Sequence, residues 1–113
     1  MVRTRTSETA DRAGSKNSLL VFRKSNRWAN DCRIAYAGGR HAAMAEVWVL
    51  LEILRKRQQI PRHYNDHPLS GKWKGWNDCH TEGDFLVIWR YAEADDGSEE
   101  VLLAACGTHA HLF

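Results

Sequence analysis

Long apolar runs are missing from this sequence of 113 residues. A stretch such as Val47–Leu51 is far shorter than the roughly 20 apolar residues that cross a bilayer as a helix. No apolar segment of the kind found in secretory signals follows Met1. We therefore expect a cytoplasmic protein that has no membrane partner.

Cysteine is also scarce, and the motifs of several large enzyme classes are missing. Three cysteines without a CxxC spacing predict reduced thiols rather than a disulfide framework, with Cys106 packed as a small apolar side chain. The sequence contains no GxxxxGKS/T, HExxH or GxSxG pattern. These absences argue against a phosphate-binding loop, a zinc-protease helix and a serine-hydrolase turn. We expect no cofactor and no metal.

Charge is abundant but unevenly distributed. Residues 18–57 hold eight lysines and arginines against three acidic residues, whereas residues 58–113 hold four against nine. The first of these segments therefore predicts a basic surface for a polyanionic partner, and a solvated helix face is the simpler alternative.

Periodicity predicts one α+β domain over residues 18–113, preceded by a disordered tail over residues 1–17. Apolar residues spaced by three and four positions indicate two amphipathic helices, the first capped by Ser25 and ended by Gly38 and Gly39. The expected order is β-α-α-β-β-β, an antiparallel sheet with two helices packed on one face. A loop is expected over residues 58–71, and the elements are expected at residues 19–22, 26–37, 41–57, 72–80, 84–91 and 100–106.

Histidine and aspartate gather in the C-terminal half of the chain. Because side chains alternate along a strand, Asp78 and His80 share one face and Cys79 lies on the other. Asp84 follows just across a tight turn. The sequence therefore predicts that two carboxylates and an imidazole converge there.

Two further histidines can reach the same place. Pro68 holds His67 in an extended conformation, because the residue before a proline avoids the helical region. A turn at Gly107 would bring His109 back over the sheet. We expect the other three histidines to be solvated: His41, His63 and His111.

Such a cluster suits the cleavage of RNA. In that reaction the 2′-hydroxyl loses a proton and the 5′-oxygen gains one, and imidazole, with a pKa near 6.5, can serve either transfer. Carboxylates hold the imidazoles in the needed tautomer or act as bases, cations stabilise the phosphorane, and aromatic side chains stack an unpaired base. None of these steps requires a metal.

Residues 66–91 and 101–113 resemble one family of proteins. The segments DHPLSGKWKGWNDCH (66–80), followed by Asp84, and GTHAHLF (107–113) are similar to the patterns DHxLxGxWKGxRDxHxxxD and GTHxxLF of the YafQ branch of the RelE/ParE superfamily of bacterial toxins. The resemblance implies a RelE-like fold and a toxin of a type II toxin–antitoxin system. It further implies a metal-independent endoribonuclease, an mRNA interferase that enters the ribosomal A site, contacts ribosomal RNA and cleaves translated mRNA. A cognate antitoxin would neutralise it.

The resemblance also implies site residues. We expect His80 and His109 to transfer the protons, in either order, with help from His67. The carboxylates would orient the imidazoles or act as bases, and the C-terminal phenylalanine would position a nucleotide. The full set implied for catalysis is His67, Asp78, His80, Asp84, His109 and Phe113.

Two arginines of the family pattern are missing, and Asn77 and Ala105 stand in their places. Loss of the second arginine, the more obvious cation for the phosphorane, would cost about a hundredfold in rate unless another cation compensates. Arg90 lies too far along its strand from Asp84, so Lys74 is the first candidate. The residues expected to bind RNA or to stabilise charge are Lys72, Lys74, Arg62, Trp73 and Trp76.

Three other interpretations stay open. A non-catalytic toxin of the ParE type would share the fold, but that branch lacks the histidine set kept here. A metalloprotein could use several of the same side chains, yet no ligand spacing is diagnostic of zinc. A chaperoned regulatory module that has lost activity, or a weakly active toxin, is the third, and the two missing arginines support it. The side chains available to a metal are His67, Asp78, His80, His109 and His111.

Overall fold

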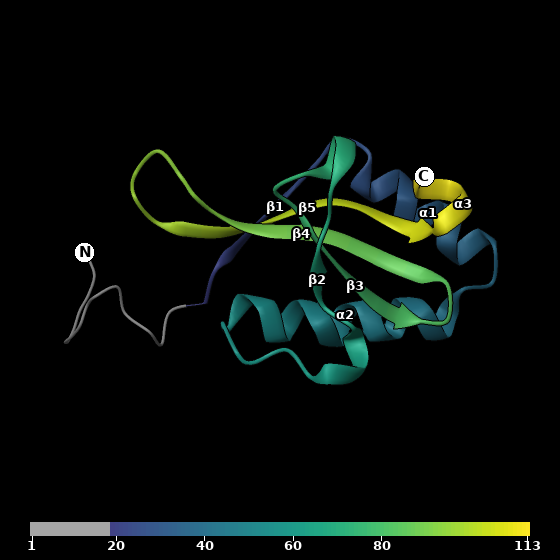
Figure 1. Cartoon of the computed structure of the whole chain (residues 1–113). Coiled ribbons are helices and arrows are strands. Elements are labelled where there is room, and N and C mark those ends of the chain that lie inside the picture. Colours follow the sequence, from purple (N-terminus) through teal and green to yellow (C-terminus); the bar gives the residue numbers. More distant parts are fainter. Residues whose placement is uncertain (1–18) are drawn as a thin grey trace.

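The computed structural model describes residues 19–113, so the tail predicted over residues 1–17 lies outside the described residues. Five strands and three helices follow one another along the chain (Figure 1). The strands are β1 (Val21–Lys24), β2 (His67–Pro68), β3 (Asn77–Glu82), β4 (Phe85–Glu93) and β5 (Glu99–Thr108). The helices are α1 (Trp28–Ala37), α2 (His41–Arg55) and the short α3 (His109–Leu112), with 3-10 turns η2 (Arg62–Tyr64) and η3 (Gly71–Trp73).

The sheet is mixed, in the order β1-β5-β4-β3-β2. All neighbouring strands are antiparallel except β1, which runs parallel to β5. The expected sheet was antiparallel throughout, so this pairing is a correction. Alternation along a strand determines which face a side chain occupies, but it leaves the neighbouring strand and its direction open. After β1 the chain passes through both helices to the far edge of the sheet, and β5 then inserts between β1 and β4.

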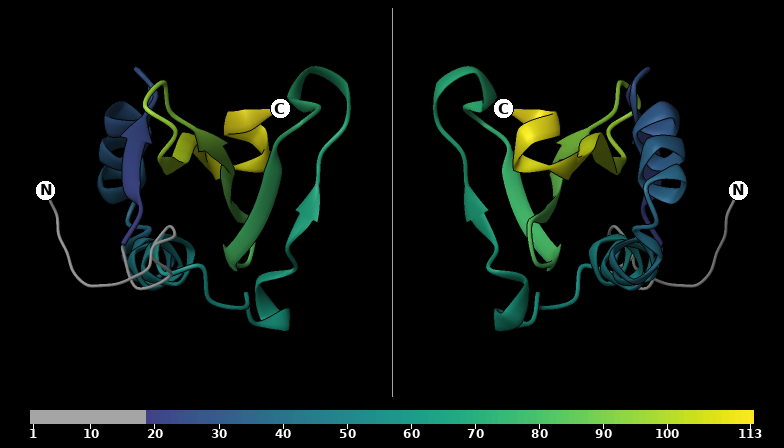
Figure 2. Two further views of the ribbon diagram at one scale, coloured as in Figure 1. Left: turned by 90° about the vertical axis from the view of Figure 1, so that its left-hand side faces the viewer. Right: turned by 90° about the vertical axis from the view of Figure 1, so that its right-hand side faces the viewer.

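Both long helices cover one face of the sheet, as predicted. Trp28 of α1 and Met44 and Leu51 of α2 pack with Val87 and Trp89 of β4 in one apolar cluster. Figure 2 shows α2 viewed along its axis and α1 beside β1. Within residues 19–113, no helix is long and apolar enough to cross a membrane.

The opposite face carries a smaller apolar cluster and the C-terminal turn. Leu86 and Ile88 of β4 pack there with Leu112 of α3, and Trp73 and Trp76 cover part of the cluster. Leu112 is buried, so the last turn of the chain is fixed to this face. In Figure 2, α3 accordingly lies between α1 and the segment that precedes β3.

The segment before β3 differs from its prediction. β3 begins at Asn77 rather than at residue 72, because Gly71 (φ 66°) and Gly75 (φ 94°) adopt left-handed backbone conformations that interrupt an extended chain. The loop predicted over residues 58–71 contains η2 and β2. The two-residue strand matters for function because it aligns a histidine with β3.

The start of α1 also needs a correction. Ser25 does not cap the helix; its hydroxyl donates a hydrogen bond to the carbonyl oxygen of Ala104 (2.6 Å). The residue before the first helical position is Arg27, which provides no side-chain cap. Ser25 therefore ties the β1–α1 connection to β5 instead of to the helix.

Candidate active site

The pairing of β2 with β3 places His67 directly opposite Asp78. Nδ1 of His67 lies 3.2 Å from Oδ1 of Asp78, and Nε2 of His80 lies 3.8 Å from the same oxygen. Asp78 is only 3% exposed, and burial raises the pKa of its carboxyl above the usual value, while the neighbouring imidazoles oppose that shift. Cys79, between the two site residues of β3, points into the helix-side core. The predicted alternation along β3 is therefore confirmed.

A backbone contact sets the tautomer of His67. Its Nδ1 lies 2.8 Å from the carbonyl oxygen of Asn65. Since a carbonyl only accepts, this contact is a hydrogen bond when Nδ1 carries the proton, which leaves Nε2 of a neutral His67 with its lone pair. Because Nδ1–H is directed at Asn65, Oδ1 of Asp78 is buried without a hydrogen-bond partner.

Four aromatic rings form a continuous row across this face. The ring centroids of His67 and His80 are 6.0 Å apart, those of His80 and His109 5.9 Å, and those of His109 and Phe113 5.8 Å. We call these four side chains the histidine row. The exposed rings of His109 and Phe113 face solvent, so a ligand can reach them.

Asp84 holds His109, the third ring of the row. Its Oδ1 accepts from Nδ1 of His109 and also from the His109 backbone N–H (3.3 Å). The hydrogen bond from the imidazole is the main reason that the pKa of Asp84 lies below its usual value. With Nδ1–H bound to the carboxylate, Nε2 of a neutral His109 is the free nitrogen.

A second histidine anchors the C-terminal turn to α1. Nε2 of His111 donates to Oδ1 of Asp31 (2.8 Å), a carboxylate that is 2% exposed. Arg27 donates to both oxygens of Asp31 (2.9 and 3.2 Å), and the Cys106 backbone N–H donates to Oδ2 (3.2 Å). We call Asp31, Arg27 and His111 the C-terminal anchor. The expectation that His111 is merely solvated is wrong, because the C-terminal turn brings it against a buried acid.

One part of the C-terminal anchor could have been predicted from the sequence. Trp28, Asp31 and Ala35 are the buried residues of α1, and their spacing is that of one helix face. An aspartate on the apolar face of an amphipathic helix predicts a buried partner. The identity of that partner depends on tertiary structure, since His111 lies at the far end of the chain.

The tryptophans lie beside the histidine row, each next to a cation. Trp73 and Trp76 meet edge to face with centroids 6.3 Å apart. The guanidinium of Arg90 lies 4.8 Å from the Trp76 centroid, and the ammonium of Lys72 lies 5.9 Å from that of Trp73. These distances fall within the range of cation–π contacts.

Two other cations were predicted at the site. Arg62 lies in η2 and Lys74 in the loop before β3, both exposed, and within residues 19–113 neither forms an ion pair. Ala105 pairs with Ile88, which in turn pairs with Asp78. The position of the missing family arginine is therefore in register with the buried carboxylate.

The three cysteines are poor nucleophiles. Burial raises the pKa of Cys79 to about 12, and it raises the pKa values of Cys32 and Cys106 as well. These thiols therefore stay protonated near neutral pH. Cys106 lies in the helix-side core, which confirms its predicted packing as a small apolar residue.

Two histidines of the row, together with Asp78, have the composition of a metal site. One donor atom each from His67, Asp78 and His80 lie within 4.8 Å of one another. Two imidazole nitrogens and a carboxylate oxygen suit zinc or a similar transition ion. The same three groups also suit proton transfer, so their geometry is compatible with either metal binding or proton transfer.

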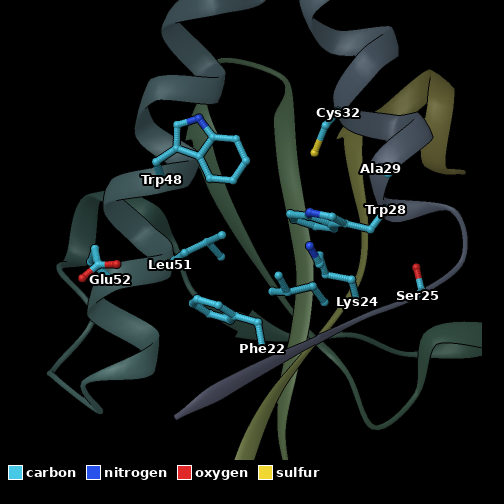
Figure 3. A pocket seen from close by; sticks show the side chains of 10 residues that line it. Phe22, Lys24, Ser25, Trp28, Ala29, Cys32, Trp48, Leu51 and Glu52 are labelled. Carbon is cyan, nitrogen blue, oxygen red and sulfur yellow. The ribbon is translucent and has the colours of Figure 1, made fainter. Parts of the chain in front are cut away.

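A separate groove lies on the helix side, away from the histidines. It has a volume of about 620 Å³, and Phe22, Trp28, Trp48 and Leu51 line it, with Lys24 and Glu52 among its polar residues (Figure 3). Trp48 is 44% exposed. We call it the helix groove.

A family model described as a bacterial toxin of a type II toxin–antitoxin system, YafQ, matches residues 19–113. The chain belongs to the YafQ family. The mRNA interferase toxin YafQ of Escherichia coli K12 is 32% identical to it over 90 residues, which cover 79% of this chain and 90% of the relative.

Solved structures of YafQ and related toxins share the fold. The E. coli DinJ–YafQ toxin–antitoxin complex aligns with a TM-score of 0.68 and 30% identity, covering 85% of this chain and 99% of that one. A metal-bound toxin from Helicobacter pylori aligns with a TM-score of 0.67 and 25% identity, covering 85% and 100%. The chain is thus a toxin of a type II toxin–antitoxin system, and both the YafQ resemblance and the RelE-like α+β fold are confirmed.

Proposed function

We propose that this chain is an mRNA interferase, an endoribonuclease that enters the ribosomal A site and cleaves translated mRNA. The observation that carries the proposal is the histidine row beside the buried Asp78, because it gathers three imidazoles from distant parts of the chain. The name of the E. coli relative, mRNA interferase toxin, supports the same activity. Such a toxin acts in the cytoplasm, where its substrate is translated.

The proton transfers fall to His80 and His109. Asp84 accepts a hydrogen bond from Nδ1–H of His109, which leaves Nε2 free. Nε2 can therefore accept the proton of the 2′-hydroxyl or, once protonated, donate a proton to the leaving 5′-oxygen. The 2′-oxygen bonds to phosphorus as the bond to the 5′-oxygen breaks, and the second imidazole performs the complementary transfer. His67 assists from the other side of His80.

Asp78 stabilises the imidazolium that forms during the reaction. Oδ1 of its carboxylate is buried and has no hydrogen-bond partner, so positive charge that develops beside it during the reaction is stabilised. This interaction is electrostatic and strengthens only when an imidazole gains a proton.

Cations and aromatic rings position the RNA. Lys74, with Lys72 and Arg62, would contact phosphate oxygens and supply part of the charge that the missing arginine provides in relatives. Phe113, at the open end of the histidine row, would stack the nucleotide next to the cleaved linkage, and Trp73 and Trp76 would stack others.

The test is a cleavage assay on mRNA in programmed ribosomes. We expect His109→Ala to fold and to bind antitoxin but to cut at least about a hundredfold more slowly, the usual range for loss of general acid–base catalysis. His63→Ala is the matched control, since His63 is exposed and its ring stacks on Tyr64, outside the row. Equal rates for His109→Ala and wild type would refute the catalytic role. DNA damage through gyrase with intact mRNA would favour a ParE-type toxin instead.

Metal independence needs its own experiment. Because ribosomes require Mg²⁺, the chelator must be selective for transition ions, as 1,10-phenanthroline is. We expect unchanged cleavage in its presence. A loss of activity that zinc restores would instead assign His67, Asp78 and His80 to a metal centre.

We also propose a cognate antitoxin as the partner of the helix groove. The complex of E. coli YafQ with DinJ supports a protein partner. The aromatic floor of the groove and the basic excess of residues 18–57 suit an amphipathic, acidic antitoxin segment. We expect Trp48→Asp to escape neutralisation by the antitoxin while keeping its cleavage rate. Full neutralisation of that variant would place the antitoxin elsewhere.

A further inference from the structure

A groove opens on the histidine side of the sheet, next to the two tryptophans. It has a volume of about 470 Å³, within the range of about 300–1,000 Å³ typical of small-ligand sites. We call it the tryptophan groove, and define it by Trp73, Trp76, Ala104 and the cations Arg23, Lys24 and Arg27, which line it. We infer that it binds the nucleotides of the same mRNA that flank the cleaved linkage, an inference that rests on the proposed function.

The strand register connects this groove with the histidine row. Trp76 precedes Asp78 by two residues, and Arg90 follows Ile88, the β4 partner of Asp78, by two. Two strand residues span about 7 Å, a distance that neighbouring nucleotides of an unstacked RNA strand can bridge. An RNA whose scissile linkage lies at the histidine row therefore reaches Trp76 and Arg90 with its next nucleotides.

The side chains have the chemistry of a single-strand binding surface. The guanidinium of Arg90 lies 4.8 Å from the centroid of the Trp76 ring, and Trp73 adds a second indole at right angles (89° between the rings). Indoles stack bases of any sequence, and cations beside them take the phosphates. Both indoles are partly buried against the apolar cluster that contains Leu112, so they are held in place before a ligand arrives.

The charge of the groove favours a polyanion. Arg23 is paired with Glu100 (2.9 Å) and Arg27 with Asp31 (2.9 Å), which fixes their orientation. In the part of the chain that the structure describes, no acidic side chain lines the groove, and Lys24, which also lines the helix groove, has no ion-pair partner. An acidic antitoxin segment would match this charge too, but paired indoles beside the histidine row favour nucleobases.

The groove supplies binding rather than chemistry. It brings cations to the substrate in a chain where Asn77 and Ala105 replace two arginines of the family pattern. Because its contacts are made to nucleotides that do not react, they are present equally in the ground and transition states. Changing them should therefore raise KM and leave kcat nearly unchanged.

The test measures RNA affinity in a toxin that does not consume its ligand. Fluorescence anisotropy of a labelled single-stranded RNA is recorded with His109→Ala toxin carrying Trp76→Leu or Arg90→Gln. The control is Arg33→Gln, which removes one charge from an exposed α1 arginine whose side chain donates a hydrogen bond to Asn30 (2.8 Å). We expect each groove variant to raise the Kd for RNA by about five- to tenfold, as for loss of one base-stacking or phosphate contact. The control should raise it by less than about twofold. Arg90 is exposed, so its variant keeps the fold even if Trp76→Leu does not.

Two further readouts separate the possible failures. In toxin with His109 intact, the groove variants should raise KM for ribosome-programmed mRNA at constant kcat. Unchanged RNA affinity in both variants would refute RNA binding in the tryptophan groove and would leave the proposed function standing. Unchanged RNA affinity with weakened antitoxin binding would also refute RNA binding there, and would make the groove a protein site. Weakened RNA affinity in a wild-type background that never cleaves mRNA would support the groove and refute the nuclease.

Discussion

The substitution Asp31→Asn tests whether the C-terminal anchor positions the turn that carries His109. It keeps the shape of the side chain but removes the charge that accepts hydrogen bonds from Arg27, His111 and the Cys106 backbone N–H. His109 and Phe113 lie in the same turn as His111. Weakening the anchor should therefore disturb the histidine row without touching it.

The expected cost follows from the burial of the three partners. Breaking a fully buried ion pair costs about 3–5 kcal/mol, but the side chains of Arg27 and His111 are 41% and 31% exposed and can be rehydrated. The amide also retains one acceptor oxygen. We therefore expect a loss of about 2 kcal/mol in the free energy of unfolding, or roughly 10 °C in Tm for a domain of this size. If the whole loss falls on the docking of α3, kcat drops by at most about thirtyfold.

The assay combines urea unfolding with ribosome-programmed cleavage. Glu46→Gln is the matched control, because Glu46 is a helix carboxylate, less buried than Asp31, that accepts a hydrogen bond from Tyr64 (2.9 Å), outside the C-terminal turn. We expect it to lose about 1 kcal/mol of stability with unchanged kcat. A destabilised Asp31→Asn toxin that cleaves at the wild-type kcat would refute the positioning role and leave the anchor a purely structural feature.

Two other substitutions test neighbouring parts of the site. Burial raises the pKa of Asp78, so the folded state holds its proton more tightly than the unfolded state does, and stability falls as pH rises above the exposed-aspartate value of about 3.9. Asp78→Asn should thus raise Tm at pH 7 but not at pH 3, while cleavage drops at least about tenfold; a lower Tm at pH 7 would contradict this. Gly107→Ala would put a Cβ 2.5 Å from Cδ2 of His111 and should displace α3, lowering kcat. Gly97→Ala, with positive φ but open space around it, should cost similar backbone strain and leave kcat unchanged.

The local part of the site could be predicted from sequence because it depends on strand geometry alone. Asp78 and His80 are two residues apart, so any strand through them brings their side chains to one face. Asp84 follows across the turn after His80, and in the structure its carboxylate contacts His109. His109 required only a chain reversal at the end of β5, and the structure provides it as α3.

Long-range pairing could not be predicted in this way. Whether His67 faces Asp78 depends on the two-residue strand β2, which is too short to leave a periodic pattern. The parallel pairing of β1 with β5 likewise depends on the path of the whole chain. Residue type and spacing indicated which side chains belong to the site, while the tertiary structure determined which carboxylate each one meets.

A common rule connects the histidines that the structure places in contact with carboxylates. Three acids from three parts of the fold contact four histidines: Asp78 of β3 contacts His67 and His80, Asp84 of the β3–β4 turn contacts His109, and Asp31 of α1 contacts His111. Two of these acids are almost fully buried, and a buried carboxylate destabilises a fold unless a cation or donor faces it. Asp31 is fully hydrogen-bonded, whereas Oδ1 of Asp78 has no such partner. The acid with an unpartnered oxygen lies at the histidine row, and the fully hydrogen-bonded acid lies in the C-terminal anchor. This distribution is the one expected if Asp78 takes part in catalysis and Asp31 positions the C-terminal turn.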